Sequence, residues 1–224
     1  MLKLSAFGTL KSTVKNLTNE QSVEEYSLNI LIPMSGTGQR FLKAGYKLPK
    51  PMIEVEGRTI ISHVVDMFPG DNLITFICNN DHLGDQFLKM FTELSSLTQN
   101  SQIIGIDSHK KGPGYAVEQV FDQIDTSTPM VINYCDFTCY WDFDDFVSFT
   151  KETGCDGAIP CYRGFHPHHL TENRYAYVKE NSAWVTDIHE KMSFTDTPMN
   201  EYASSGTYYF KSGDMARYYI NDNM

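Results

Sequence analysis

Basic side chains and glycines gather in one short stretch of the chain, residues 28–51. An apolar run, residues 28–33, ends in a loop that contains Gly36 and Gly38, and the cations Arg40 and Lys50 follow. Glycines allow backbone N–H groups to approach an anion closely, and the two cations add full positive charges. The pattern predicts a polyphosphate site around residues 34–38, which we call the Gly loop and which comprises Met34, Ser35, Gly36, Thr37 and Gly38.

The position of the Gly loop supports this prediction more than its glycines do. Gly36-x-Gly38 is not a P-loop, because no Gly-Lys-Ser/Thr follows it, and it lacks the third glycine of a dinucleotide fingerprint. Taken alone, it also fits a tight turn with two solvated basic residues. A buried strand that leads into such a loop places it at the carboxyl end of a sheet, where open α/β folds bind ligands.

A carboxylate follows a second apolar run in the same way. Asp136 comes directly after the expected strand at residues 129–134. The carboxyl ends of parallel strands lie at one edge of a sheet, so Asp136 should lie near the Gly loop. Phosphate ligands commonly bind together with Mg²⁺, which one or two carboxylates hold. We therefore expect Asp136 to bind the metal, although it also fits a turn or a helix cap. Asp142 and Asp144 form a competing D-x-D motif of the glycosyltransferase kind, in which Asp144 also fits a helix cap.

The hydrophobic pattern predicts alternating strands and helices up to residue 134, and more strands after it. Such alternation indicates βαβ units and a mainly parallel sheet, with Asp81 expected as a helix cap. The later strands suit a substrate-binding half attached to the half that contains the Gly loop. The expected strands are 28–33, 72–78, 102–106, 129–134, 157–162, 175–179, 184–188 and 204–210; the expected helices are 59–68, 82–94, 115–124 and 144–151, with a last one from residue 212.

Composition excludes several classes of protein. The chain has 224 residues and a net charge of −10, which disfavours binding to nucleic acid or to an anionic membrane surface. No apolar run approaches the ~20 residues of a membrane span, and we see no secretory signal. Five scattered cysteines indicate a reducing cytoplasm without a disulfide framework. We interpret Cys135 and Cys139 as ordinary thiols rather than a metal pair. The histidines between residues 166 and 169 suggest either a metal site or, as we prefer, a loop near a substrate pocket.

The whole of residues 28–51 resembles the signature of the sugar-1-phosphate nucleotidyltransferase (pyrophosphorylase) superfamily: an apolar strand, a G-x-G-x-R-(F/L) loop and P-K-P. These motifs stand here as Gly36-Thr37-Gly38-Gln39-Arg40-Phe41 and Pro49-Lys50-Pro51. The resemblance covers residues 29–214. It implies an α/β, Rossmann-like nucleotidyltransferase sandwich with a mixed, mostly parallel central sheet and a strand-rich substrate-binding half. We expect this domain to span residues 28–224 and leave open whether it is truncated at its C-terminal end. We expect residues 1–27 to form an extension, a linker or an extra packing element.

Further matches follow in the order that the family has them. The segment at residues 111–116 resembles the one that holds the base and ribose, which implies that Gly112 binds the nucleotide, although the segment also fits a glycine-rich loop before a helix. Asn79 is a second candidate contact because it lies at the end of the second expected strand. Asp136 falls at the family's metal position. Glu190 and Lys191 resemble an E-K-P element in which Met192 replaces the proline, and Gly206 resembles the glycine of a G-x-Y-x-F strand. The resemblance implies that the acceptor-binding residues are Glu190, Lys191 and Gly206.

The resemblance also implies a reaction. A sugar-1-phosphate, or a similar small phosphorylated acceptor, would attack the α-phosphorus of a nucleoside triphosphate with the help of Mg²⁺ and release pyrophosphate. Arg40 would stabilise the pyrophosphate and Lys50 the charge around the α-phosphate, so that these two are the expected catalytic residues. The usual setting of the family is the synthesis of precursors of bacterial surface polysaccharide. A homo-oligomer and an additional domain in a longer chain are both open.

Two other function classes stay open. A glycosyltransferase would use Asp142 and Asp144 and would consume a nucleotide-sugar. A non-catalytic nucleotide-binding or regulatory domain is the other class, because the family usually has a second metal-binding Asp well after the G-x-Y-x-F strand. Asp214 comes too early in the chain for that role.

Overall fold

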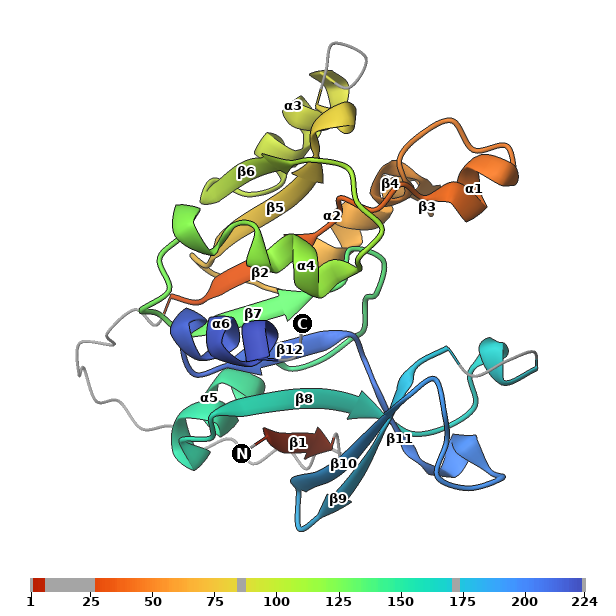
Figure 1. Cartoon of the computed structure of the whole chain (residues 1–224), viewed down its shortest axis with the longest axis vertical. Helices are drawn as coiled ribbons and strands as arrows, with labels where there is room; N and C mark the ends of the chain where they lie inside the picture. The colour runs from red at the N-terminus through yellow and green to blue at the C-terminus, as the bar shows by residue number, and fades with distance from the viewer. Residues whose placement is uncertain (1, 7–26, 84–87, 171–173, 223–224) are drawn as a thin grey trace, which may run out of the picture.

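The computed structural model describes residues 2–6, 27–83, 88–170 and 174–222. Ten strands of this described part form one sheet, in the order β1-β10-β9-β11-β8-β12-β7-β2-β5-β6 (Figure 1). Their bounds are β1 Leu2–Ala6, β2 Asn29–Pro33, β5 Leu73–Asn79, β6 Ser101–Ile106, β7 Met130–Asn133, β8 Gly157–Tyr162, β9 Ala176–Asn181, β10 Trp184–Glu190, β11 Tyr202–Ser204 and β12 Thr207–Phe210. Glu54–Val55 (β3) and Arg58–Thr59 (β4) form a separate hairpin.

The centre of the sheet is parallel, as the sequence predicts. β2 pairs in parallel with β5 on one edge and with β7 on the other, and β5 pairs in parallel with β6. Ile30 is aligned with Ile74 of β5 and with Val131 of β7. The carboxyl ends of β2 and β7 therefore lie next to each other, which brings the segment after Pro33 close to the segment after Asn133.

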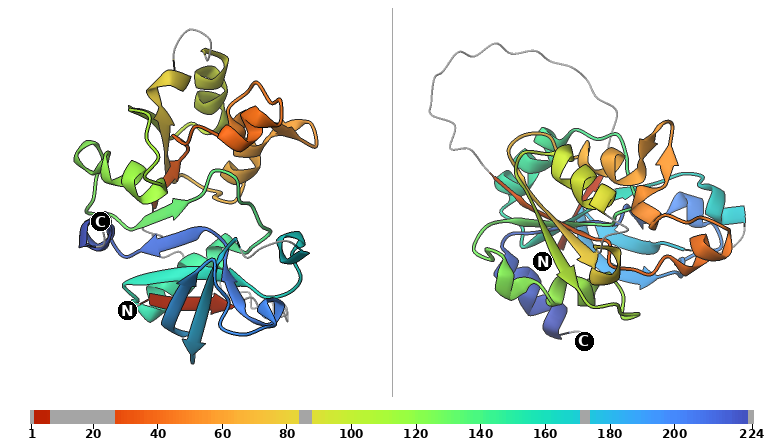
Figure 2. Two further views of the ribbon diagram at one scale, coloured as in Figure 1. Left: turned by 45° about the vertical axis from the view of Figure 1, so that its right-hand side comes forward. Right: turned by 90° about the horizontal axis from the view of Figure 1, so that it is seen from above.

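Helices cover both faces of the central strands. On one face, α2 Ile60–Val65, α3 Leu88–Leu97 and α5 Phe143–Thr153 pack in one apolar cluster with Ile30 and Ile32. On the other face, α4 Pro113–Glu118 and α6 Gly213–Asp222 pack in a second cluster with Leu31 (Figure 2). Successive side chains of a strand point to opposite faces, so a strand buried on both faces is apolar throughout. The predicted α/β sandwich is confirmed.

The strand-rich half continues the same sheet. β12 is antiparallel to both β7 and β8, and so joins the two halves. Beyond it, β8, β11, β9 and β10 pair in succession, and β1 closes them into a ring because it pairs with β10 and also, in parallel, with β8. Leu2–Ala6 is therefore an extra strand of this half, whereas residues 7–26 of the expected extension lie outside the described residues.

Three local predictions are wrong in detail. The strand expected at residues 204–210 is two strands, β11 and β12, because the chain turns at Gly206, whose φ is 77°. Asp142, not Asp144, caps α5, since its side chain accepts a hydrogen bond from the N–H of Asp145 (2.9 Å). Asp81 lies inside a 3-10 turn, η2 Asn80–His82, whose cap is Asn79.

Helix bounds also differ from the predictions. α4 starts and ends earlier than expected and is followed by η4 Phe121–Gln123. The helix expected from residue 82 is described only as α3 from Leu88, because residues 84–87 lie outside the described part. The remaining short helices are α1 Gln39–Lys43, η1 Lys50–Met52, η5 Pro167–Leu170 and η6 Pro198–Asn200.

Two further expectations concern metal binding and membrane-spanning segments. Within the described residues, no helix is both long and apolar enough to span a bilayer, and no three His, Cys, Asp or Glu side chains gather as a metal site. All five cysteines are free thiols. His169 instead contacts the hydroxyl of Tyr177 through Nε2 (3.2 Å) and accepts the N–H of His166 (3.1 Å).

Candidate functional site

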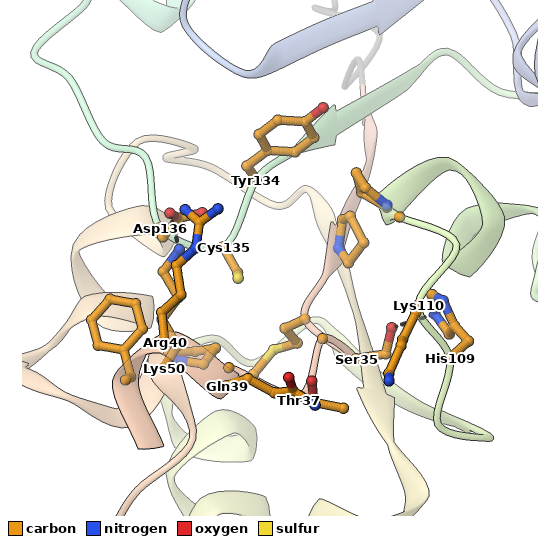
Figure 3. A pocket seen from close by; sticks show the side chains of 18 of the residues that line it. Ser35, Thr37, Gln39, Arg40, Lys50, His109, Lys110, Tyr134, Cys135 and Asp136 are labelled. Carbon is orange, nitrogen blue, oxygen red and sulfur yellow. Dashed lines mark hydrogen bonds and ion pairs between the residues drawn. The ribbon is translucent and has the colours of Figure 1, made fainter. Parts of the chain in front are cut away.

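A pocket of about 760 Å³ opens at the carboxyl ends of β2 and β7 (Figure 3). The Gly loop forms its floor, and segments after β6 and β7 complete its walls. The lining includes most of the residues that the sequence singled out for catalysis, for the nucleotide and for the metal. These are Met34, Ser35, Gly36, Thr37, Gly38, Arg40, Lys50, Gly112 and Asp136.

The Gly loop leaves room for a ligand against its backbone. A Cβ added to Gly36 would meet no atom within 4 Å, so the protein itself does not fill this space. Gly38 has φ of 59°, a left-handed conformation that favours glycine. The N–H of Met34 is bonded to Ile77 (2.9 Å), whereas the described residues show no backbone acceptor for the N–H groups of residues 35–40. Those groups stay available to phosphate oxygens.

Lys50 and Asp136 meet directly beside the Gly loop. Lys50 Nζ donates a hydrogen bond to Asp136 Oδ2, and the two side chains are 29% and 37% exposed. Lys50 follows Pro49 and lies against Gly38, where an added Cβ would be 3.9 Å from the Cβ of Lys50. Its ammonium also lies 5.4 Å from the centre of the Phe41 ring. Two residues that are 86 positions apart therefore form one ion pair at the pocket wall.

The pocket suits a divalent cation that arrives with phosphates. Asp136 offers an accessible carboxylate, and Mg²⁺ commonly combines one or two carboxylates with waters and substrate phosphates. In the described part of the chain no further acidic side chain lines the pocket. The donor set therefore fits a metal that Asp136 holds on one side and a polyphosphate on the other.

Positive charge prevails around the pocket even though the whole chain is acidic. Arg40, Lys43, Lys50 and Lys110 line it, against the single carboxylate of Asp136 among the described residues. Figure 3 shows Arg40 and Lys50 both pointing toward Asp136. Such a local excess of cations favours an anionic ligand.

The lining also includes residues that the sequence did not single out, among them His109, Lys110 and Tyr134. His109 Nε2 lies 2.9 Å from Ser35 Oγ, and burial, helped by the charge of Lys111, lowers the pKa of the His109 imidazole. In Figure 3, His109 and Lys110 lie across the pocket from Arg40 and Lys50. The signal available in the sequence was that His109 and Lys110 come just before residues 111–116, the segment expected to hold the base.

The residues expected to bind the acceptor lie beyond Tyr134, outside the pocket lining. Gly206 accepts the N–H of Tyr134 (3.0 Å), and a Cβ on Gly206 would come within 2.9 Å of the Tyr134 ring. The pKa of Tyr134 is raised chiefly by burial, next by the neighbouring Tyr208 hydroxyl, and also by the charge of Glu190. Lys191 pairs with Glu190 (3.2 Å), and both side chains are exposed. These residues therefore lie on the strand-rich side of Tyr134.

Asn79 does not reach the pocket. It is 1% exposed, and its side-chain oxygen accepts the N–H of Asp81 at 2.9 Å. Its carboxamide is used to cap the turn after β5, because a short Asn side chain bonds readily to the backbone two residues on. The structure thus gives Asn79 a role in the turn in place of the expected contact with the nucleotide.

The other acidic candidates lie away from the pocket. Asp142 is the cap of α5, and Asp144 is an exposed residue of the first turn of that helix. Asp214 accepts a hydrogen bond from Thr126 Oγ1 (2.5 Å), which precedes the amino end of β7. Asp214 therefore lies at the opposite end of β7 from Asp136.

Known proteins are similar to this chain in sequence and in fold. The family model described as "Nucleotidyl transferase" matches residues 30–223. The bifunctional protein GlmU of Ralstonia pickettii (strain 12J) is 29% identical over 111 residues, which are 49% of this chain and 22% of that protein. This chain thus covers about a fifth of the length of such curated relatives.

Solved structures share the fold. The nucleoside-diphosphate-sugar pyrophosphorylase from Vibrio cholerae RC9 superposes with a TM-score of 0.66 at 21% identity, over 87% of this chain and 78% of that one. The UTP-bound UGPase from Acinetobacter baumannii gives a TM-score of 0.62 at 16% identity, over 85% and 76% of the two chains.

Proposed function

Because this chain belongs to the nucleotidyl transferase family, we propose that it transfers a nucleoside monophosphate from a nucleoside triphosphate to a small phosphorylated acceptor and releases pyrophosphate. A sugar-1-phosphate is the acceptor that the proposal favours. The observation that carries it is the contact of Lys50 with Asp136 beside the open backbone of the Gly loop. This arrangement supplies a cation, a metal ligand and free N–H groups at one end of the sheet.

In the proposed reaction the residues of this chain mainly position charges. The Gly loop holds the phosphates, Arg40 stabilises the pyrophosphate as it leaves, and Lys50 neutralises charge around the α-phosphate. A bound Mg²⁺ would supply a second positive charge to the phosphate oxygens, and Asp136 is the residue that would hold it. Phosphoryl transfer depends chiefly on such positioning and electrostatic stabilisation.

The acceptor is proposed to bind on the strand-rich side of Tyr134. Gly206 approaches Tyr134 closely, and Glu190 is near enough to influence its pKa. Glu190 would bind sugar hydroxyls and Lys191 the phosphate of the acceptor. For this, Lys191 would exchange its exposed contact with Glu190 for the ligand.

We also propose the extent of the domain and the setting of the reaction. Residues 28–224 form the transferase domain, and residues 1–27 are an extension of which Leu2–Ala6 completes the strand-rich half. The cytoplasm and the synthesis of surface-polysaccharide precursors are the proposed setting. The cytoplasm is proposed because the five cysteines are free thiols, and the polysaccharide setting is proposed because of the family resemblance.

Thermal stability with each nucleoside triphosphate, with and without Mg²⁺, tests the first half of the proposal. A triphosphate at about 100 times its dissociation constant stabilises a protein by roughly 2.7 kcal/mol. We expect one triphosphate to raise the melting temperature, and Lys50→Ala to reduce that shift. Pyrophosphate release with candidate acceptor phosphates then tests turnover, which Lys50→Ala should lower by ~10²–10³.

Lys47→Ala is the matched control. Lys47 is an exposed lysine of the same loop that does not line the pocket, so its loss should leave the shift and the turnover near those of the wild type. Turnover of Lys50→Ala at the wild-type rate would remove Lys50 from the mechanism. Binding of a nucleotide-sugar, with no shift from any triphosphate, would favour glycosyl transfer instead.

A further inference from the structure

We propose that His109 is a positioning residue for the triphosphate: it holds the Gly loop through Ser35 and so sets the spacing between two walls of the pocket. The inference rests on the proposed function, since the ligand of the Gly loop is a nucleoside triphosphate. It assigns a role to a residue that the sequence did not single out.

The hydrogen bond between Ser35 and His109 joins loops that are not neighbours in the sheet. Ser35 follows β2 and His109 follows β6, and β5 lies between these strands. The Ser35 Oγ to His109 Nε2 distance is 2.9 Å, and Ser35 is 3% exposed. Both residues line the pocket, on the same side as Lys110 (Figure 3). This side-chain contact therefore bridges the Gly loop and the loop that contains Gly112.

The surroundings of the imidazole fix its proton on Nε2. The backbone N–H of Lys111 donates to His109 Nδ1 (3.3 Å), which requires a lone pair on that atom. A neutral ring then carries its proton on Nε2 and donates it to Ser35 Oγ. The lowered pKa of His109, caused by burial and by Lys111, agrees with a neutral ring near pH 7.

Packing holds the ring in this orientation. The His109 ring meets Tyr115 of α4 edge-on, with 4.8 Å between the ring centres. The ammonium of Lys111 lies over the same Tyr115 ring, 4.3 Å from its centre. His109 is therefore fixed to the start of α4, and Ser35 is fixed to His109. Loss of the imidazole would let the Gly loop move relative to Gly112, so that one bound nucleotide could not contact both at once.

The dissociation constant of the stabilising triphosphate, measured by calorimetry, tests the inference. His109→Ala and Ser35→Ala should each weaken binding about tenfold, the size of one neutral hydrogen bond. The double variant should be no weaker than either single variant, because both changes remove the same bond. His109→Gln should restore binding to within about twofold, since a glutamine amide can donate in place of Nε2.

His63→Ala is the matched control, because the His63 ring also makes a hydrogen bond (to the carbonyl of Val55, 3.0 Å) but does not line the pocket. It should bind the triphosphate like the wild type. Additive losses in the double variant, or a His109→Gln variant as weak as His109→Ala, would overturn the inference while the proposed function stands. A wild-type protein that binds no triphosphate would instead overturn the proposed function itself.

Discussion

At the scale of single residues, Lys50 and Asp136 form an ion pair, so each side chain offsets the charge that the other would present to a ligand. Without a ligand, the carboxylate neutralises the ammonium. A cation that binds Asp136 would free Lys50 for phosphate oxygens, so metal and nucleotide should bind cooperatively. The pair thus links the two roles that the sequence predicts separately.

Asp136→Asn tests this link. The amide is similar in size but is a poor ligand for Mg²⁺, and it removes a negative charge that faces the phosphates. We expect metal-free triphosphate to bind at least as well as in the wild type, and the extra stabilisation by Mg²⁺ to disappear. Melting curves at increasing Mg²⁺ measure both effects. An unchanged response to Mg²⁺ would show that Asp136 is not the metal ligand.

Gly36→Ala tests the open backbone of the Gly loop. The added methyl meets no protein atom within 4 Å, and Gly36 is not among the glycines of positive φ. The unfolding free energy should therefore change by less than about 1 kcal/mol. The affinity for triphosphate should fall at least tenfold, because the methyl occupies space that the phosphates need.

Gly114→Ala is the control for that experiment. Its Cβ would also meet nothing within 4 Å, and Gly114 does not line the pocket. Its affinity should match that of the wild type. A Gly36→Ala protein with wild-type affinity would place the phosphates elsewhere.

That the Gly loop, Arg40, Lys50 and Asp136 lie at one pocket was predictable, because each belongs to or follows a recognisable local pattern. His109 was not, since its bond to Ser35 spans 74 positions and passes the end of β5. The turn cap made by Asn79 was not predictable, because a position at a strand end suits a ligand contact and a turn cap equally. Only the hydrogen bond to Asp81 shows which of the two it makes.

At the scale of elements, strands buried on both faces were the most predictable. Residues 72–78 were expected as a strand, and β5 is Leu73–Asn79. The break between β11 and β12 was not predictable from apolar residues, because β-rich sequence continues through it. It depends on the turn at Gly206, which gives β11 and β12 different partners: β9 and β8 for the first, β7 and β8 for the second.

The cap of α5 yields a prediction at this scale. Asp142→Ala removes the acceptor for the N–H of Asp145 and should lower the unfolding free energy by ~1 kcal/mol in denaturant titrations. Asp142→Asn should lose much less, because asparagine is also a good cap. Both proteins should keep full turnover. A loss of turnover in Asp142→Asn would instead indicate that the D-x-D motif takes part in the reaction.

At the scale of the whole molecule, β1 closes the ring of strands and gives a further prediction. Leu4 is aligned with Ile159, and β1 has paired strands on both edges. Leu4→Pro removes a backbone N–H from an interior strand, which sheets tolerate poorly. Hydrogen exchange should speed up in β8 and β10 but stay slow in β2, and triphosphate should still bind. Leu4→Val, which keeps the N–H, is the control; unchanged exchange in Leu4→Pro would argue against the closed ring.

The unbroken sheet also restricts how the enzyme can move. β12 is bonded to β7 on one edge and to β8 of the strand-rich half on the other, so a hinge between the two parts of the sheet would have to break this ladder. Rigid-body domain closure, common among enzymes with separate lobes, is thus costly here. Of the described helices outside this ladder, α1 is the one that contributes several residues to the pocket lining, so a movement over the pocket would involve α1 before it involves the two halves of the sheet.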